Sequence, residues 1–214
     1  MGIFLVRLTI LIQALRVLAV LLILQTLFAI FSNYPDYFPP NFESLFLLGR
    51  EKTFSGIYPL AFYIHIFTGP LVLLNGLFLL SDTLRSRYRA THRFLGWVQV
   101  LVLLILFLPS SLIMACFAFA GFWSGLSFFL LTLTTAISTT LGVHYARRRS
   151  FGLHRRWMQR SYVLICSAIT LRLISGTLSL YEISNAEIAY IIASWCSWLV
   201  PLLLYETFAR VHLR

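Results

Sequence analysis

Long runs of apolar residues, separated by short polar stretches, make up most of the chain. A helix that crosses a bilayer needs about 20 mainly apolar residues. Six runs meet that length: residues 8–31, 58–80, 94–119, 122–145, 158–180 and 188–209. The pattern predicts an all-α fold, a polytopic membrane helix bundle with six transmembrane helices. Arg16 interrupts the first run, but no small-x-small cleavage pattern follows it, so we expect a retained helix rather than a signal peptide.

The composition excludes the main classes of soluble protein. Apolar residues are 59% of the 214, charged residues are 11%, and the mean hydropathy is +0.85. Soluble domains carry about 25% charged residues. A soluble enzyme, a secreted disulfide-rich domain and a disordered tail are therefore excluded. The three cysteines lie inside apolar runs and no CxxC motif occurs, so neither disulfide chemistry nor covalent haem attachment is indicated.

Basic residues are distributed unequally between the two sides of the predicted bundle. Both termini and the loops 81–93 and 146–160 together hold 14 of the 17 basic residues. The opposite side holds Arg50 and Lys52 with five of the seven acidic residues. By the positive-inside rule, we expect the arginine-rich side to face the cytoplasm, with both termini on that side. The net charge of +10 does not indicate nucleic-acid binding, because the basic residues lie in short stretches between apolar runs.

We expect two parts in the chain: residues 1–57, a first transmembrane helix with its outer loop, and residues 58–214, a five-helix membrane core. The core contains two similar hairpins, 58–119 and 122–180, whose inner loops read RSRYRATHRFLGW and RRRSFGLHRRWMQR. Aligning the His-Arg pairs of the two loops also matches two further arginines, which suggests a parallel duplication. The alternative is that arginine-rich loops resemble one another through topology alone.

Small residues mark the expected helix contacts. The turn between the third and fourth helices is short, so these helices should be antiparallel neighbours. Gly121 and Gly125 have a GxxxG spacing, which permits close approach of two backbones. A seam on one face of the fourth helix should point into the bundle, and it consists of Thr132, Thr135, Thr139 and Gly142.

Two ionisable residues lie in the outer half of the predicted spans, where such residues are costly and indicate a functional site. His65 is about 10 Å and Arg172 about 12 Å from the outer surface at a rise of 1.5 Å per residue. They could line a path for a transported solute or a lipid. The alternative is structural: Arg172 bonds backbone carbonyls and His65 bonds a hydroxyl.

A second polar layer lies at the inner side and contains Asn75, Gln99, His92, His144, His154 and Glu206. Paired imidazoles on facing helices are common axial ligands of b-type haem, so His92 and His154 are candidate haem ligands. Arg93 and Arg155 could then bind the haem propionates. The alternative is that these histidines cap helices or contact lipid head groups. No catalytic or metal-binding motif is present, so no catalytic residue and no metal site are predicted.

The remaining inner arginines have a simpler interpretation, because anionic lipids attract basic residues beside the membrane. We expect lipid head-group contacts from Arg85, Arg87, Arg89, Arg147, Arg148, Arg149, Arg156 and Arg160.

The chain resembles a family of bacterial membrane proteins known as domain of unknown function 2306. The resemblance rests on HIFTGPLVLLNG from His65, HRFLGW from His92, HRRWMQRSYVLICSAITLRL from His154 and the ending SWCSWLVPLLLYE. It covers residues 58–210. The resemblance places the following residues at motif positions: His65, His92, His154, Arg155, Trp157, Met158, Arg160, Ser161 and Arg172. It implies a polytopic inner-membrane protein, does not include His144 and supplies no reaction.

Three functional hypotheses follow from the sequence. The favoured one is an accessory or structural subunit that packs with other membrane subunits of a larger assembly. The second is a b-type haem protein in electron transfer, with His92 and His154 as axial ligands. The third is a small transporter or lipid-handling protein that uses His65 and Arg172.

Overall fold

The computed structural model describes residues 2–43, 45–180 and 185–212, and every regular element within these ranges is a helix. Two compact units are present, Met1–Gly49 and Arg50–Arg214. The first contains α1 (Gly2–Ser32) and two short 3-10 turns, Tyr34–Asp36 and Leu45–Leu47. Six helical stretches in the described residues are long and apolar enough to cross a membrane, which confirms the predicted all-α, six-span architecture.

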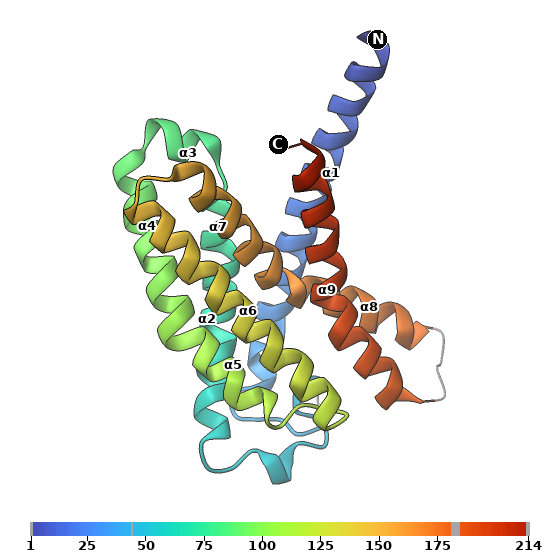
Figure 1. Ribbon diagram of the computed structural model, residues 1–214. Helices are drawn as coiled ribbons and strands as arrows, with labels where there is room; N and C mark the ends of the chain where they lie inside the picture. The colour runs from blue at the N-terminus through green and yellow to red at the C-terminus, as the bar shows by residue number, and fades with distance from the viewer. Residues whose placement is uncertain (1, 44, 181–184, 213–214) are drawn as a thin grey trace. The chain divides into compact units, whose positions relative to one another are not determined.

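The second unit carries the other five spans (Figure 1). Its elements are the 3-10 turn Glu51–Thr53, α2 (Tyr58–Leu79), α3 (Asp82–Arg87), α4 (Arg89–Leu101), the π-helical segment Val102–Phe107, α5 (Leu108–Ala115), α6 (Phe122–Arg147), α7 (Phe151–Ile165), α8 (Ser167–Leu180) and α9 (Ala186–His212). α2 packs against α4, the π-helical segment and α5, while α6 packs along α7 and α8 along α9.

The third and fifth spans are not single regular helices. In the third, the Leu108 N–H bonds the Leu103 carbonyl five residues back, and Pro109, which has no N–H, follows. The fifth span begins at Phe151 rather than at the predicted residue 158, because the first turns of α7 are helical although rich in arginine. It breaks at Cys166, and in Figure 1 α8 turns away from α7 to run beside α9.

Small residues mediate the contacts of α6, as the sequence predicts. A Cβ atom on Gly125 would lie 2.7 Å from the Ala115 carbonyl oxygen, so only glycine permits this approach of α6 to the end of α5. Gly121 has a different role, because its φ of +72° forms the turn between those helices. All four members of the predicted seam are buried: Thr132, Thr135, Thr139 and Gly142.

The predicted inner loop 81–93 is largely helical. The Ser81 hydroxyl accepts a hydrogen bond from the Leu84 N–H at 3.4 Å and so caps α3. α4 then begins at Arg89, so His92 lies on its first turn. α3, the start of α4 and the start of α7 lie at the same end of the second unit (Figure 1).

Candidate functional site

His65 on α2 contacts two residues of the third span: Phe107, at the end of the π-helical segment, and Ser111 on α5. The Ser111 hydroxyl donates to the Phe107 carbonyl at 2.7 Å, so it has no further proton to give. Ser111 Oγ must therefore accept the 3.1 Å bond from the Nδ1–H of His65. The His65 ring also stacks on the Phe107 ring, with 4.6 Å between centroids and 22° between planes. These contacts orient the imidazole and leave Nε2 as its proton acceptor.

Arg172 on α8 donates to the Ala168 carbonyl of its own helix at 3.0 Å. Its guanidinium lies close enough to His65 for an electrostatic interaction. The two outer residues singled out from the sequence therefore lie within range of an electrostatic interaction. Both also make the local bonds that the structural alternative describes, His65 to a hydroxyl and Arg172 to a backbone carbonyl.

At the arginine-rich end, His154 on α7 is oriented by the seam of α6. The distance from His154 Nδ1 to the Gly142 carbonyl oxygen is 2.8 Å. A carbonyl only accepts, so Nδ1 carries a proton, and in the neutral imidazole Nε2 then has the lone pair. Histidines that bind metals generally have this arrangement, in which the other ring nitrogen donates to a carbonyl or carboxylate.

His92 on α4 lies near His154, at a separation that gives the two rings an electrostatic interaction. The Nδ1 atom of His92 is buried and has no hydrogen-bond partner within the part of the chain that the structure describes. Most buried polar atoms have a partner, so an unpartnered one points to a ligand or an ordered water molecule. The structure thus places the two candidate haem ligands, from two different spans, at the same end of the bundle.

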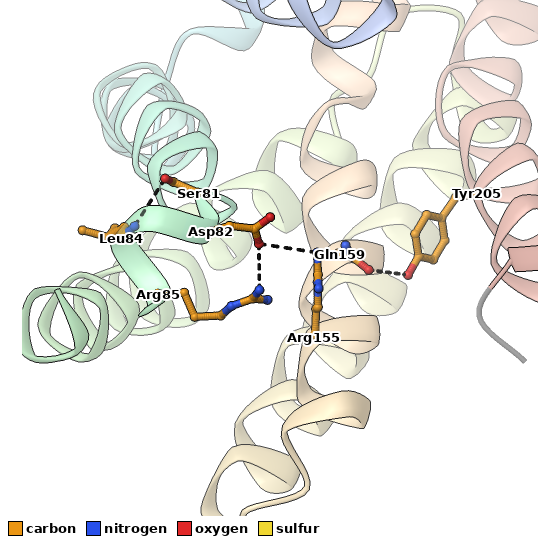
Figure 2. A network of polar contacts seen from close by, with 7 residues as sticks. All are labelled: Ser81, Asp82, Leu84, Arg85, Arg155, Gln159 and Tyr205. Atoms are coloured by element: carbon orange, nitrogen blue, oxygen red, sulfur yellow. Dashed lines mark hydrogen bonds and ion pairs between the residues drawn. The ribbon is translucent and has the colours of Figure 1, made fainter. Parts of the chain in front are cut away.

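Polar side-chain contacts connect α7 to α3 on one side and to α9 on the other (Figure 2). Asp82 of α3 accepts from Arg85 at 2.7 Å and lies 3.6 Å from Arg155, the residue that follows His154. On the other side, the Tyr205 hydroxyl of α9 lies 3.1 Å from Gln159 Oε1. These contacts connect α7 to a helix on each side, close to His154 in the sequence.

The residues next to Gln159 and Tyr205 form a charged pair that also joins α7 to α9. Both nitrogens on one edge of the Arg160 guanidinium bond the Glu206 carboxylate, with NH2 to Oε2 at 3.0 Å. The guanidinium also lies 4.5 Å from the centroid of the Trp157 ring. Arg160, which the sequence grouped with the lipid-contacting arginines, is therefore engaged inside the bundle.

A pair of side-chain amides, Asn75 and Gln99, joins α2 to α4. Asn75 Nδ2 donates to Gln99 Oε1 and to the Leu95 carbonyl, both at 3.0 Å, and Gln99 Nε2 donates to the Val72 carbonyl at 2.9 Å. Because each of these donors is satisfied, this part of the inner polar layer serves helix packing.

Two other predicted site residues, His144 and Arg93, are exposed. His144 is exposed on the last turn of α6, with its ring edge-on to Tyr145. Arg93 is exposed on α4. Within residues 2–43, 45–180 and 185–212, no group of three or more His, Cys, Asp or Glu side chains could hold a metal ion.

Sequence reasoning did not identify Ser111, Phe107 and Asp82 as parts of the site. Ser111 follows Pro109 within an apolar run, and that interruption is the one signal in the sequence of an irregular helix carrying a polar contact. Asp82 is the one acidic residue in the inner loop 81–93. A single carboxylate among arginines is a reasonable predictor of an ion pair, but not of which arginine it binds.

Comparison with known protein families identifies a match. The sequence profile of a family described as a predicted membrane protein, DUF2306, matches residues 62–209. This range includes His65, His92, His154, Arg160 and Arg172. No curated protein and no solved structure matches the chain.

Proposed function

Since the chain belongs to this family of predicted membrane proteins, DUF2306, and is a multi-pass membrane protein, we propose that it binds b-type haem between His92 and His154 and transfers electrons within the membrane. The observation that carries the proposal is the presentation of two neighbouring imidazoles from different spans. One has its Nδ1–H bonded to a backbone carbonyl, and the other has a buried nitrogen with no partner among the described residues.

The residues present suit haem better than a simple metal ion. Two neutral imidazoles are a complete axial set for haem iron, whereas a structural metal needs more ligands than this cluster offers. When bound, haem supplies one-electron chemistry. The chain orients His154 through Gly142 and anchors α7 through the ion pair of Arg155 with Asp82. Arg155 also places a positive charge beside His154, where a haem propionate would be stabilised.

The test is haem stoichiometry in protein purified in mild detergent from haem-replete cells, measured as the pyridine haemochrome. We expect close to one haem per chain in the wild type and near-complete loss in His92→Ala and in His154→Ala. His144→Ala is the matched control, because His144 lies at the same end of the bundle but is exposed, and it should keep its haem. Haem-free wild-type protein that is folded would overturn the proposal.

An accessory or structural subunit is the second candidate, and a specific observation favours it. Several polar side chains within the spans bond to one another across helices: Arg160 with Glu206, Asn75 with Gln99, and Thr139 with Ser161. Such groups fix helix packing, as expected of a scaffold for other membrane subunits. Under this hypothesis the protein co-purifies with a defined membrane partner and shows no visible absorption. Both proposals include a location in the bacterial inner membrane, which the family resemblance implies. They also include cytoplasmic termini, which rest on the arginine distribution.

The third hypothesis, transport or lipid handling through His65 and Arg172, has weaker support. Both residues make local hydrogen bonds, and their electrostatic proximity is the one feature in its favour.

A further inference from the structure

The side chains along one ridge of α4 change from cationic at its start to apolar at its end. Arg89, Arg93, Trp97 and Leu101 are spaced four residues apart, so they follow one side of the helix, and all four are exposed. Trp97 is 47% and Leu101 51% exposed. The opposite side of the helix carries Gln99, which is buried and bonded to α2. The ridge therefore faces away from the bundle, toward lipid.

A third guanidinium reaches this ridge from another hairpin. Arg147, on the last turn of α6, lies over the Trp97 ring at 5.5 Å from its centroid. Arg93 precedes Trp97 by one helical turn, so the indole has a guanidinium on the neighbouring helix and another on its own helix.

These arginines are not neutralised within the part of the chain that the structure describes. None of the three arginines Arg89, Arg93 and Arg147 forms a salt bridge there. Asp82 and Glu206 are already engaged, since Asp82 binds Arg85 and Arg155, and Glu206 binds Arg160. Excess positive charge therefore remains beside an exposed indole and an aliphatic stripe.

We propose that this ridge is a binding site for an anionic phospholipid of the bilayer. The lipid phosphate lies between Arg93 and Arg147, and the acyl chains lie along Trp97 and Leu101. Guanidinium groups bind phosphate through paired N–H donors, and tryptophan favours the head-group level of a membrane. The order of the ridge, from arginine through indole to aliphatic side chain, matches the order of chemistry in a phospholipid. The proposal is independent of haem binding.

The test compares lipid binding by native mass spectrometry of the full chain in detergent, with phosphatidylglycerol and phosphatidylcholine as probes. The test variant is Arg93→Gln with Arg147→Gln. The matched control is Arg87→Gln with Arg149→Gln, which removes the same charge from two other exposed arginines of the set expected to contact lipid head groups. Neither lies on the ridge or stacks on Trp97, so both attract anionic lipids through general charge alone. We expect the wild type to prefer phosphatidylglycerol, the test variant to lose about tenfold in its affinity, and the control to stay within about twofold.

Trp97→Leu provides a second measurement, because it keeps every charge and removes the indole. It should weaken phosphatidylglycerol binding while the variant stays folded, since Trp97 is half exposed. An equal loss of affinity in the test and control double variants would overturn the proposal, because the arginines would then act only through net charge. Equal binding of the two lipids by the wild type would also overturn it.

Discussion

The Nδ1 atom of His154 donates its proton to the carbonyl oxygen of Gly142 across 2.8 Å, which links α7 to the seam of α6. Two further observations show how closely α6 and α7 approach each other here. The hydroxyls of Thr139 and Ser161 lie 2.7 Å apart, and a Cβ atom on Gly142 would lie 2.5 Å from the sulfur of Met158. The close approach of α6 and α7 therefore determines which nitrogen of His154 is presented.

The first prediction concerns Gly76, where α2 meets α7. A Cβ atom there would lie 2.4 Å from a ring carbon of Tyr162, and this ring is fixed because its hydroxyl donates to the Leu73 carbonyl at 3.0 Å. Overpacking of this kind costs about 1–3 kcal/mol. We expect Gly76→Ala to lower the Tm in detergent clearly, as measured by thermal unfolding.

Gly96→Ala is the matched control for that substitution. It introduces the same methyl group into a helix of the same bundle, but nothing lies within 4 Å of the new atom. Alanine is also the better helix former by about 1 kcal/mol. The Tm of Gly96→Ala should therefore equal or exceed the wild-type value, and a comparable fall in both variants would contradict the assignment of Gly76 to a close contact.

The second prediction concerns the charged pair of Arg160 and Glu206, whose side chains are 21% and 26% exposed. Glu206→Ala leaves the guanidinium without its carboxylate in a partly buried position. Breaking a fully buried pair costs about 3–5 kcal/mol, and partial exposure reduces that cost to about 1–3 kcal/mol. The free energy of unfolding should fall by this amount.

The double variant Arg160→Met with Glu206→Leu tests the cause of that loss. It removes both charges and restores apolar volume, so its unfolding free energy should lie closer to the wild type than that of Glu206→Ala. A double variant less stable than the single variant would show that the pair itself, and not the unpaired charge, accounts for the effect.

The third prediction compares two neighbouring serines. Ser110 and Ser111 both donate to the Phe107 carbonyl, at 2.8 and 2.7 Å, but only Ser111 also accepts from His65. Ser111→Ala removes the acceptor of the imidazole N–H, which costs about 1–3 kcal/mol for a buried donor. In Ser110→Ala the Phe107 carbonyl keeps its other donor, so the fall in Tm should be smaller. Equal losses would mean that the bond to His65 contributes nothing to stability.

The fourth prediction concerns orientation in the membrane. In a chain whose three cysteines are replaced by alanine, single cysteines are introduced as Arg148→Cys and Lys52→Cys, at two exposed positions on the predicted opposite sides. An impermeant maleimide applied to intact cells should label only Lys52→Cys, because the arginine-rich side is expected to be cytoplasmic. Labelling of Arg148→Cys alone would contradict the predicted orientation and place the arginine-rich side outside the cytoplasm.

The six spans were predictable because length and hydropathy alone decide which segments can cross a bilayer. The start of the fifth helix was not, because the first turns of α7 contain Arg155 and Arg156, which a hydropathy criterion excludes. In the structure Arg155 pairs with Asp82, and Arg160 further along α7 pairs with Glu206; these partners lie 73 and 46 positions away in the sequence. Such long-range ion pairs leave no local signal.

The histidines of the candidate site were evident as polar residues at the ends of apolar runs. Their geometry was not evident, because it depends on backbone atoms of other helices. The partner of His154 is a carbonyl oxygen of a glycine on α6, and that of His65 is the hydroxyl of Ser111 on α5. Neither contact follows from residue types, whereas the burial of the threonine seam on α6 followed from its three-and-four spacing.

The most direct test of the haem proposal is the absorption spectrum of the purified protein before and after reduction with dithionite. We predict a Soret band and, on reduction, a sharp α band, both lost in His92→Ala and His154→Ala and retained in His144→Ala. A folded wild-type protein from haem-replete cells with no visible absorption in either state would contradict the haem proposal and favour the accessory-subunit alternative.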